Sequence, residues 1–165
     1  MTSEPHHPAT TASATRVEGL SRAVLRLRLK PVAPHRGHVD GAWWPSSREL
    51  PAELPGLLDA VADRLGSVDR VVYASTFWGS APNRLELGGR VVALEGLAAL
   101  DTDTVHITGG DQRRIDLLVI PPEASGAAAD RAMAGAASPD NDHLPAAILA
   151  TAGIRATSRN RYRNR

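Results

Sequence analysis

Cysteine is absent from the 165 residues of this chain. A chain without thiols can form neither a disulfide framework nor a thiolate zinc site, and it is compatible with a reducing compartment. Long apolar runs are also absent, since none approaches the roughly 18 residues of a membrane span. The first residues lack the cationic and then apolar segments of a signal peptide. We therefore expect a cytoplasmic protein with no membrane partner.

Aromatic residues and lysine are scarce. Aromatics make up 4% of the chain, and one lysine stands beside eighteen arginines. Such an arginine bias is typical of a GC-rich genome, so the arginine count alone does not indicate a nucleic-acid partner. The net charge is +1, and five arginines without an acidic residue lie within residues 155–165. The rest of the chain is therefore mildly acidic.

The ends of the chain differ in composition from its middle. Residues 1–19 are rich in Thr, Ala, Ser and Pro without an apolar period, and we expect a disordered leader there. Residues 20–138 are expected to form the folded domain, followed by a short helical segment over 139–154. The last residues, 155–165, would form a basic tail.

The first strand is predicted from strict alternation. Leucine alternates with a basic residue over residues 24–30, which is the period of a half-buried strand. One face would meet the core. The other would present the three cations Arg26, Arg28 and Lys30 to solvent.

The clearest helix is predicted over residues 54–65. Leucine, valine and alanine recur there at helical spacing, and Gly66 is placed to end the helix. Proline is tolerated only in a first turn, where backbone donors have no acceptor within the helix. Because of Pro51 and Pro55, regular helix is expected to begin near Pro55.

The remaining strands are predicted from β-branched runs and glycine turns. Residues 68–75 read as an interior strand. A Gly-Gly pair joins residues 84–87 to 90–94 in a tight hairpin, and a Gly-Gly-Asp turn joins residues 104–108 to 114–120.

Two shorter helices are expected over residues 125–137, which are nearly all alanine and glycine, and over 143–152. One long helix among strands that follow one another in hairpins predicts an α+β fold. We expect a single domain with a twisted, mostly antiparallel sheet packed against one main amphipathic helix.

An unusual motif, Val39-Asp40-Gly41-Ala42-Trp43-Trp44-Pro45, places two of the three tryptophans side by side. Further motifs are Arg26-Leu27-Arg28-Leu29-Lys30-Pro31, Gly37, Glu53-Leu54-Pro55, Val68, Arg70-Val71, Tyr73, Trp78, Pro82, Gly89-Arg90, the strand end from Leu117 to Pro122, and Pro139-Asp140-Asn141. With these motifs, residues 25–122 resemble a family of small, uncharacterised actinobacterial proteins that share a domain of unknown function. The resemblance implies a single-domain cytosolic protein and carries no activity, cofactor or catalytic residue.

The tryptophan pair is the main candidate site. Neighbouring side chains in extended backbone point to opposite faces, so Trp43 and Trp44 are expected to divide between core and surface. The pair either fastens its loop over the sheet or lines a pocket for an anionic or planar ligand. The candidate ligand-binding residues are Arg26, Arg28, Asp40, Trp43, Trp44 and Trp78.

The sequence therefore favours a noncatalytic binding module that uses this corner to hold a small anionic ligand or a protein partner; it does not give the oligomeric state. The alternative is a small enzyme whose site is assembled by the fold from Asp40, His38, Tyr73 or His106. The chain has no nucleophile elbow, phosphate loop or dinucleotide fingerprint. A third hypothesis is a weak nucleic-acid accessory protein, because the basic tail would bind phosphates without sequence preference.

No metal or other cofactor is expected. His35 and His38 are two histidines in a glycine loop, whereas a zinc site needs further ligands. Asp101 and Asp103 begin like a calcium loop, but Val105 follows where a ligand is needed and no glutamate closes the loop.

Overall fold

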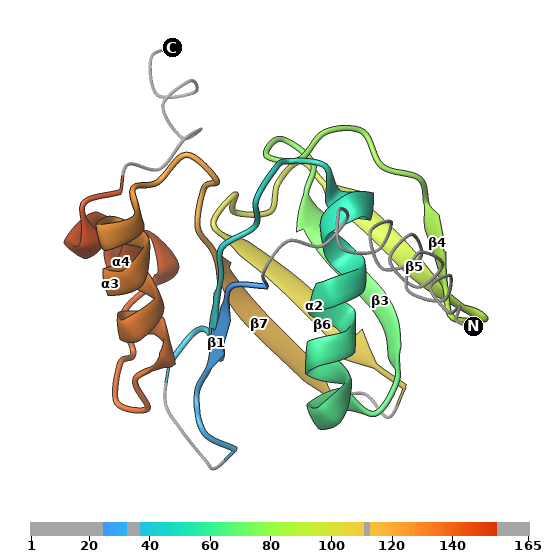
Figure 1. Ribbon diagram of the computed structural model, residues 1–165, viewed down its shortest axis with the longest axis horizontal. Helices are drawn as coiled ribbons and strands as arrows, with labels where there is room; N and C mark the ends of the chain where they lie inside the picture. The colour runs from blue at the N-terminus through green and yellow to red at the C-terminus, as the bar shows by residue number, and fades with distance from the viewer. Residues whose placement is uncertain (1–24, 33–36, 111–112, 155–165) are drawn as a thin grey trace, which may run out of the picture.

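The computed structural model describes residues 25–32, 37–110 and 113–154 (Figure 1). The expected disordered leader, residues 1–19, and the basic tail, residues 155–165, lie outside these ranges, as does His35. The elements in chain order are β1 (Leu27–Leu29), β2 (Gly41–Trp43), α2 (Leu50–Leu65), β3 (Val68–Ala74), β4 (Arg84–Leu87), β5 (Arg90–Leu97), β6 (Thr104–Gly109), β7 (Arg114–Val119), α3 (Gly126–Ala137) and α4 (Pro145–Ala152).

All seven strands belong to one sheet in the order β1-β2-β7-β6-β3-β5-β4. Four neighbouring pairs are antiparallel, whereas β2–β7 and β3–β5 are parallel. The α+β class and the mostly antiparallel sheet are thus confirmed. The expectation of one main helix is incomplete, because the described ranges contain three helices.

The strand directions gather several loops at one edge of the sheet. Strands β2, β7, β3 and β5 run in the same direction, since β7 and β3 are both antiparallel to β6. Their C-terminal ends therefore meet at one edge, where α2 and α3 also begin. We call this edge, at the top of Figure 1, the loop edge.

Helix α2 begins earlier than expected, at Leu50 instead of Pro55. Pro51 lies in the first turn, where no intrahelical acceptor is needed, and Pro55 lies inside the helix and leaves only one early hydrogen bond unmade. The helix ends at Gly66, whose φ of +78° favours glycine. Its buried residues are Leu50, Leu54, Leu57, Leu58, Val61 and Leu65. Each such side chain contributes about 1.5–3 kcal/mol of burial, enough to outweigh the proline defect.

Both predicted hairpins are present. Gly88 and Gly89 connect β4 to β5 with φ values of +57° and +82°, which match a type I′ turn. Strands β6 and β7 form the second hairpin. The interior position of the strand after α2 is also confirmed, because β3 lies between β6 and β5.

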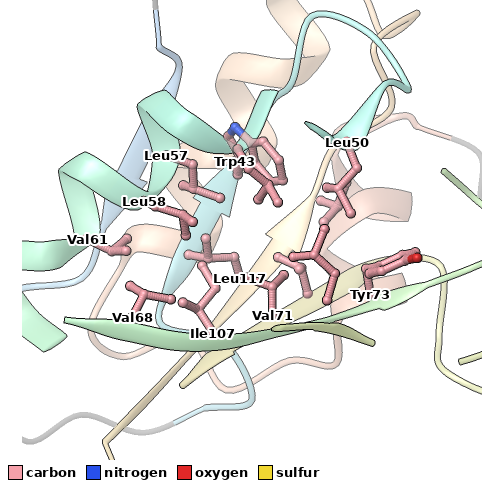
Figure 2. Packing of buried hydrophobic residues seen from close by; sticks show 14 of the residues in the cluster. Trp43, Leu50, Leu57, Leu58, Val61, Val68, Val71, Tyr73, Ile107 and Leu117 are labelled. Carbon is pink, nitrogen blue, oxygen red and sulfur yellow. The ribbon is translucent and has the colours of Figure 1, made fainter. Parts of the chain in front are cut away.

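The sheet carries a separate hydrophobic core on each face. Helix α2 packs on one face, and Figure 2 shows its residues Leu57 and Val61 directed toward strand residues that include Ile107 and Leu117. On the other face, the alanine-rich helix α3 lies close to β2 because its side chains are small. The second core consists of Val39, Ala42, Leu118, Ile120, Ala128, Ala129, Ala132, Met133, Ala136, Ile148, Leu149, Ala152 and Ile154.

Helices α3 and α4 cover only the end of the sheet that contains β1, β2 and β7 (Figure 1). Most outward positions of β6, β3 and β5 on this face are exposed or half-buried, whereas Thr104, beside Leu118, is buried. The exposed and half-buried positions include Thr108, His106, Arg70, Val72, Val91, Ala93 and Glu95. We call them the uncovered face, since no helix in the described ranges packs on them. None of the described helices is both long enough and apolar enough to cross a membrane.

Candidate functional site

Two of the predicted site residues lie inside the main core. Trp43 is 1% exposed and Trp78 is 5% exposed. Their rings stack with centroids 5.3 Å apart and an interplanar angle of 22°, and Phe77 meets Trp78 edge-on at 5.1 Å. The aromatic surface of this pair is therefore directed at other core residues at the loop edge.

Trp44 and Arg26 form a second pair on the opposite face of the sheet. The Trp44 Nε1–H group donates to the carbonyl oxygen of Pro121 at 3.1 Å, and the Arg26 guanidinium lies 3.7 Å above the indole ring. Arg26 also donates to the carbonyl oxygens of Trp44 and Pro45, both at 3.2 Å. The neighbouring indoles thus point to opposite faces, as their extended backbone predicts, and Arg26 fastens the corner.

Arg28 and Asp40 lie apart from these aromatic contacts. Arg28 is exposed on β1. The Asp40 carboxylate accepts the backbone N–H of Asp116 at 2.8 Å, in the middle of β7. The six predicted residues therefore do not form one continuous surface.

The prediction of three solvent-facing cations on the first strand is wrong for Lys30. Its side chain is fully buried, and its Nζ donates to the carbonyl oxygen of Asn141 at 3.1 Å. The loop between α3 and α4 closes over this end of β1, which alternation within the strand could not reveal. Burial lowers the pKa of Lys30, and the negative charges of Asp40 and Asp142 partly oppose that shift.

Arg48 links two segments at the loop edge, those of Phe77 and Glu123, and the sequence did not indicate this role. Its Nη2 donates to both oxygens of the Glu123 carboxylate, at 2.9 and 2.7 Å, and its guanidinium lies 4.1 Å from the Phe77 ring centroid. The hydrogen bond from Arg48 lowers the pKa of Glu123. The two residues are 75 positions apart, so no local pattern indicates the pair.

The residues of the expected enzyme alternative do not all come together: Asp40 and His106 both contact Asp116, whereas Tyr73 and His38 lie elsewhere. Tyr73 is 6% exposed in the core under α2, and its ring packs against Gly96. His38 is exposed, and His106 lies on the face of the sheet opposite Tyr73. Within the ranges that the structure describes, no group of three or more His, Asp or Glu side chains is placed to hold a metal ion.

His106 nevertheless belongs to a polar cluster at the border of the uncovered face. Its Nδ1 lies 2.6 Å from Oδ1 of Asp116, and both side chains are about one-fifth exposed, at 24% and 18%. Arg114 binds the same carboxylate through Nε at 2.9 Å and Nη2 at 3.1 Å. Since the carboxylate accepts from Nδ1–H, the other ring nitrogen, Nε2, is left to accept or donate a proton.

Asp116 and Arg114 were absent from the predicted site, although the hairpin that carries them was predicted. The β6–β7 register pairs His106 with Asp116 and Thr108 with Arg114. A register assigned from the predicted turn would have indicated the His106–Asp116 pair.

Three donor side chains lie in one line across neighbouring strands. Thr108 of β6 is paired with Arg114 of β7 on one side and with Arg70 of β3 on the other. We call these three residues the arginine row. Arg70 also contacts Glu95 through Nη1 at 3.2 Å, and both arginine side chains are more than half exposed. Along β6, Thr108 of the row lies two residues from His106, on the same face of the sheet.

Comparisons with known proteins give a family and no activity. No curated protein and no solved structure matches the chain. Residues 26–136, from just before β1 almost to the end of α3, match the family described as "Family of unknown function (DUF5994)". This match supports the resemblance to an uncharacterised domain family, and the chain belongs to DUF5994.

Proposed function

We propose that this protein is a noncatalytic binding module for a ligand or partner that carries a phosphate or carboxylate group. Its binding surface is the uncovered face together with the exposed Arg114 at its border on β7, and the arginine row, Arg114, Thr108 and Arg70, is the anion contact. The observation that carries the proposal is the placement of these three donor side chains on adjacent strands where no described helix covers them.

The geometry of the row suits an oxyanion. Neighbouring strands are about 4.8 Å apart, so the two arginines rise from backbone positions about 10 Å apart with a hydroxyl between them. A guanidinium has five N–H donors. Arg114 uses its Nε and Nη2 groups on Asp116, and Arg70 uses Nη1 on Glu95. The remaining donors can meet an anion, while the two carboxylates hold the guanidinium groups in place.

The tryptophan corner suits this role less well, because its polar groups are engaged within the protein. Arg26 donates to two backbone carbonyls and to the Ser46 hydroxyl, and it covers one face of Trp44. Trp43 and Trp78 are buried against each other. A ligand at the corner would first have to displace these contacts, whereas a ligand on the uncovered face would not.

The proposal is tested by titrating the isotope-labelled protein with inorganic phosphate and, in parallel, with succinate. Saturable amide shifts are expected at Arg70, Thr108 and Arg114, together with a shift of the His106 ring resonances. Arg70→Gln should weaken binding about tenfold, the loss expected for one charged hydrogen bond. Arg90→Gln is the matched control, because Arg90 is exposed on β5 at a position that alternates to the α2 face.

Two results would reject the assignment. Shifts concentrated at the Trp44 indole N–H and Arg26 would return the site to the corner. Equal weakening by Arg70→Gln and Arg90→Gln would indicate general charge attraction without a defined row.

General-base catalysis is a second candidate function, favoured by the 2.6 Å contact between His106 and Asp116. A carboxylate on Nδ1 orients an imidazole so that Nε2 can remove a proton from water or a hydroxyl group. The measurement is hydrolysis of p-nitrophenyl esters and phosphates by the wild type and by His106→Asn. Activity that follows a single ionisation and disappears in the variant would favour an enzyme over a binding module.

A further inference from the structure

Among the described residues, strand β4 forms one edge of the sheet, at the end opposite β1 (Figure 1). Its pairing with β5 shows which backbone groups face outward. The two-residue turn pairs Leu87 with Arg90, and Leu94 N–H donates to the Asn83 carbonyl at 2.8 Å. Hydrogen-bonded pairs alternate in an antiparallel ladder, so Asn83, Leu85 and Leu87 direct their backbone groups toward β5.

Arg84 and Glu86 therefore direct their N–H and C=O groups away from the sheet. Their side chains are exposed on the same side as the uncovered face. Neither side chain has a hydrogen-bond or ion-pair partner in the described part of the chain. The edge thus offers two complete sets of backbone donors and acceptors, each beside an unpaired charge, and the two charges are opposite.

Only one antiparallel register joins two such edges with matched hydrogen bonds and matched charges. When two copies of β4 pair antiparallel, residues whose backbone groups face outward must lie opposite one another. The twofold axis that relates the copies can then pass through Arg84, Leu85 or Glu86. An axis at Arg84 places two arginines opposite each other and brings in Pro82, which has no N–H. An axis at Glu86 places two glutamates together. An axis at Leu85 instead pairs Arg84 of each copy with Glu86 of the other.

The same axis also suits the opposite face of the strand. Leu85 is half-buried and packs against the main core. On the twofold axis it would meet Leu85 of the second copy at the closest approach of an antiparallel pair, about 4.5 Å between Cα atoms. Apolar contact on the α2 side and two ion pairs on the other side would therefore accompany the backbone hydrogen bonds.

From this geometry we infer that β4 is a self-association surface whose partner is β4 of a second copy, paired antiparallel about Leu85. The two sheets then become continuous. A four-residue edge buries little area, so the dimer is weak and depends on protein concentration. Charges on short edge strands usually prevent pairing. Here they exclude the two like-charged registers and leave the third. The inference does not depend on the proposed anion site.

The experiment is sedimentation velocity over protein concentrations from about 10 µM to about 1 mM, the range expected of a weak interface. The wild type should shift from monomer toward dimer. Arg84→Glu and Glu86→Arg, made singly, should each raise the dissociation constant at least about tenfold, because each turns two attractive pairs into repulsive ones. The double exchange restores opposite charges and should return the constant to within about threefold of the wild type.

Arg90→Glu is the matched control, since it makes the same charge change one strand away from the edge. Glu86→Pro removes an outward N–H without removing a bond to β5, and it should also abolish the dimer. Amide hydrogen exchange gives an independent readout, because the Arg84 and Glu86 amides should become protected as concentration rises. Far-UV circular dichroism verifies that each variant is folded.

Several outcomes would overturn the inference. These are a wild type that stays monomeric throughout, a double exchange that fails to restore association, and an Arg90→Glu effect as large as that of Arg84→Glu. Protection of the Arg84 and Glu86 amides that does not change with concentration would mean that another segment of the same chain pairs with this edge.

Discussion

The stacked pair at the loop edge gives the sharpest stability prediction, through a comparison of Trp43→Ala with Trp44→Ala. Trp43 is 1% exposed and stacks on Trp78. Removing a buried tryptophan costs about 3–5 kcal/mol, because burial is lost and a cavity remains. Trp44 is only half-buried. Its replacement removes one hydrogen bond to Pro121, about 1 kcal/mol, and a contact with Arg26, about 0.5–1 kcal/mol.

With its partial burial included, Trp44→Ala should cost about 2 kcal/mol, roughly half the cost of Trp43→Ala. The assay is urea unfolding followed by far-UV circular dichroism, with the m-value checked so that the midpoints report stability. For a domain with about 5–15 kcal/mol of total stability, both losses are measurable. The reasoning is refuted if Trp44→Ala proves as destabilising as Trp43→Ala, or if Trp43→Ala costs less than about 1 kcal/mol.

A double-mutant cycle separates the two contributions of Trp44. Arg26→Gln is made in the wild type and again in Trp44→Ala. A coupling free energy of about 0.5–1 kcal/mol is expected between the guanidinium and the indole ring. A value near zero would show that Arg26 acts only through its hydrogen bonds to the backbone carbonyls.

Three further substitutions test the electrostatics and the backbone. Burial lowers the pKa of Lys30, so the unfolded chain holds that proton more tightly than the folded protein does. The stability of the wild type relative to Lys30→Met should therefore rise as pH approaches the ordinary pKa of 10.5. Urea unfolding between about pH 8 and 10 would contradict this if the difference in stability stayed constant. Gly37→Ala should lower the free energy of unfolding by at least about 2 kcal/mol in the same assay, because φ at this position is +116° and the added methyl group would lie 2.7 Å from Nζ of Lys30. A loss of stability below about 0.5 kcal/mol would argue against that strain. Arg48 lowers the pKa of Glu123, so the stability advantage of the wild type over Glu123→Gln should be complete above the ordinary pKa of 4.5 and disappear as pH falls through the lowered pKa. A stability difference between the two proteins that stays the same at every pH would contradict the pairing.

Local patterns predicted most elements of this fold but not their arrangement. Helix α2 and the two hairpins follow from apolar periodicity and from glycine turns, which act over a few neighbouring residues. The strand order does not follow in this way. Strand β2 is three residues long, and its parallel pairing with β7 joins Ala42 to Leu118 across nearly half of the chain. Periodicity assigns a face to a residue, but it does not identify the strand beside it.

The candidate site shows the same limit. Alternation correctly predicted that Trp43 and Trp44 would point to different faces. It failed for Lys30, because the α3–α4 loop, more than one hundred positions away, buries that side chain. Asp116 could have been found from the hairpin register, whereas Arg48 and its distant partner could not. Short-range geometry is therefore encoded locally, and burial by distant segments is not.

The anion site and the sheet edge are adjacent, so the effects of a substitution on anion binding and on self-association have to be measured separately. The line of paired positions that contains the arginine row continues from Arg70 through Ala93 to Arg84 on β4. In the dimer, that line would continue to Glu86 of the second copy, so a charge change at the edge could alter anion binding through self-association. Anion titrations below the dimer range should therefore give the same affinity for the wild type and for Arg84→Glu. If the two affinities differ there, Arg84 itself contacts the anion, and the row includes a third arginine.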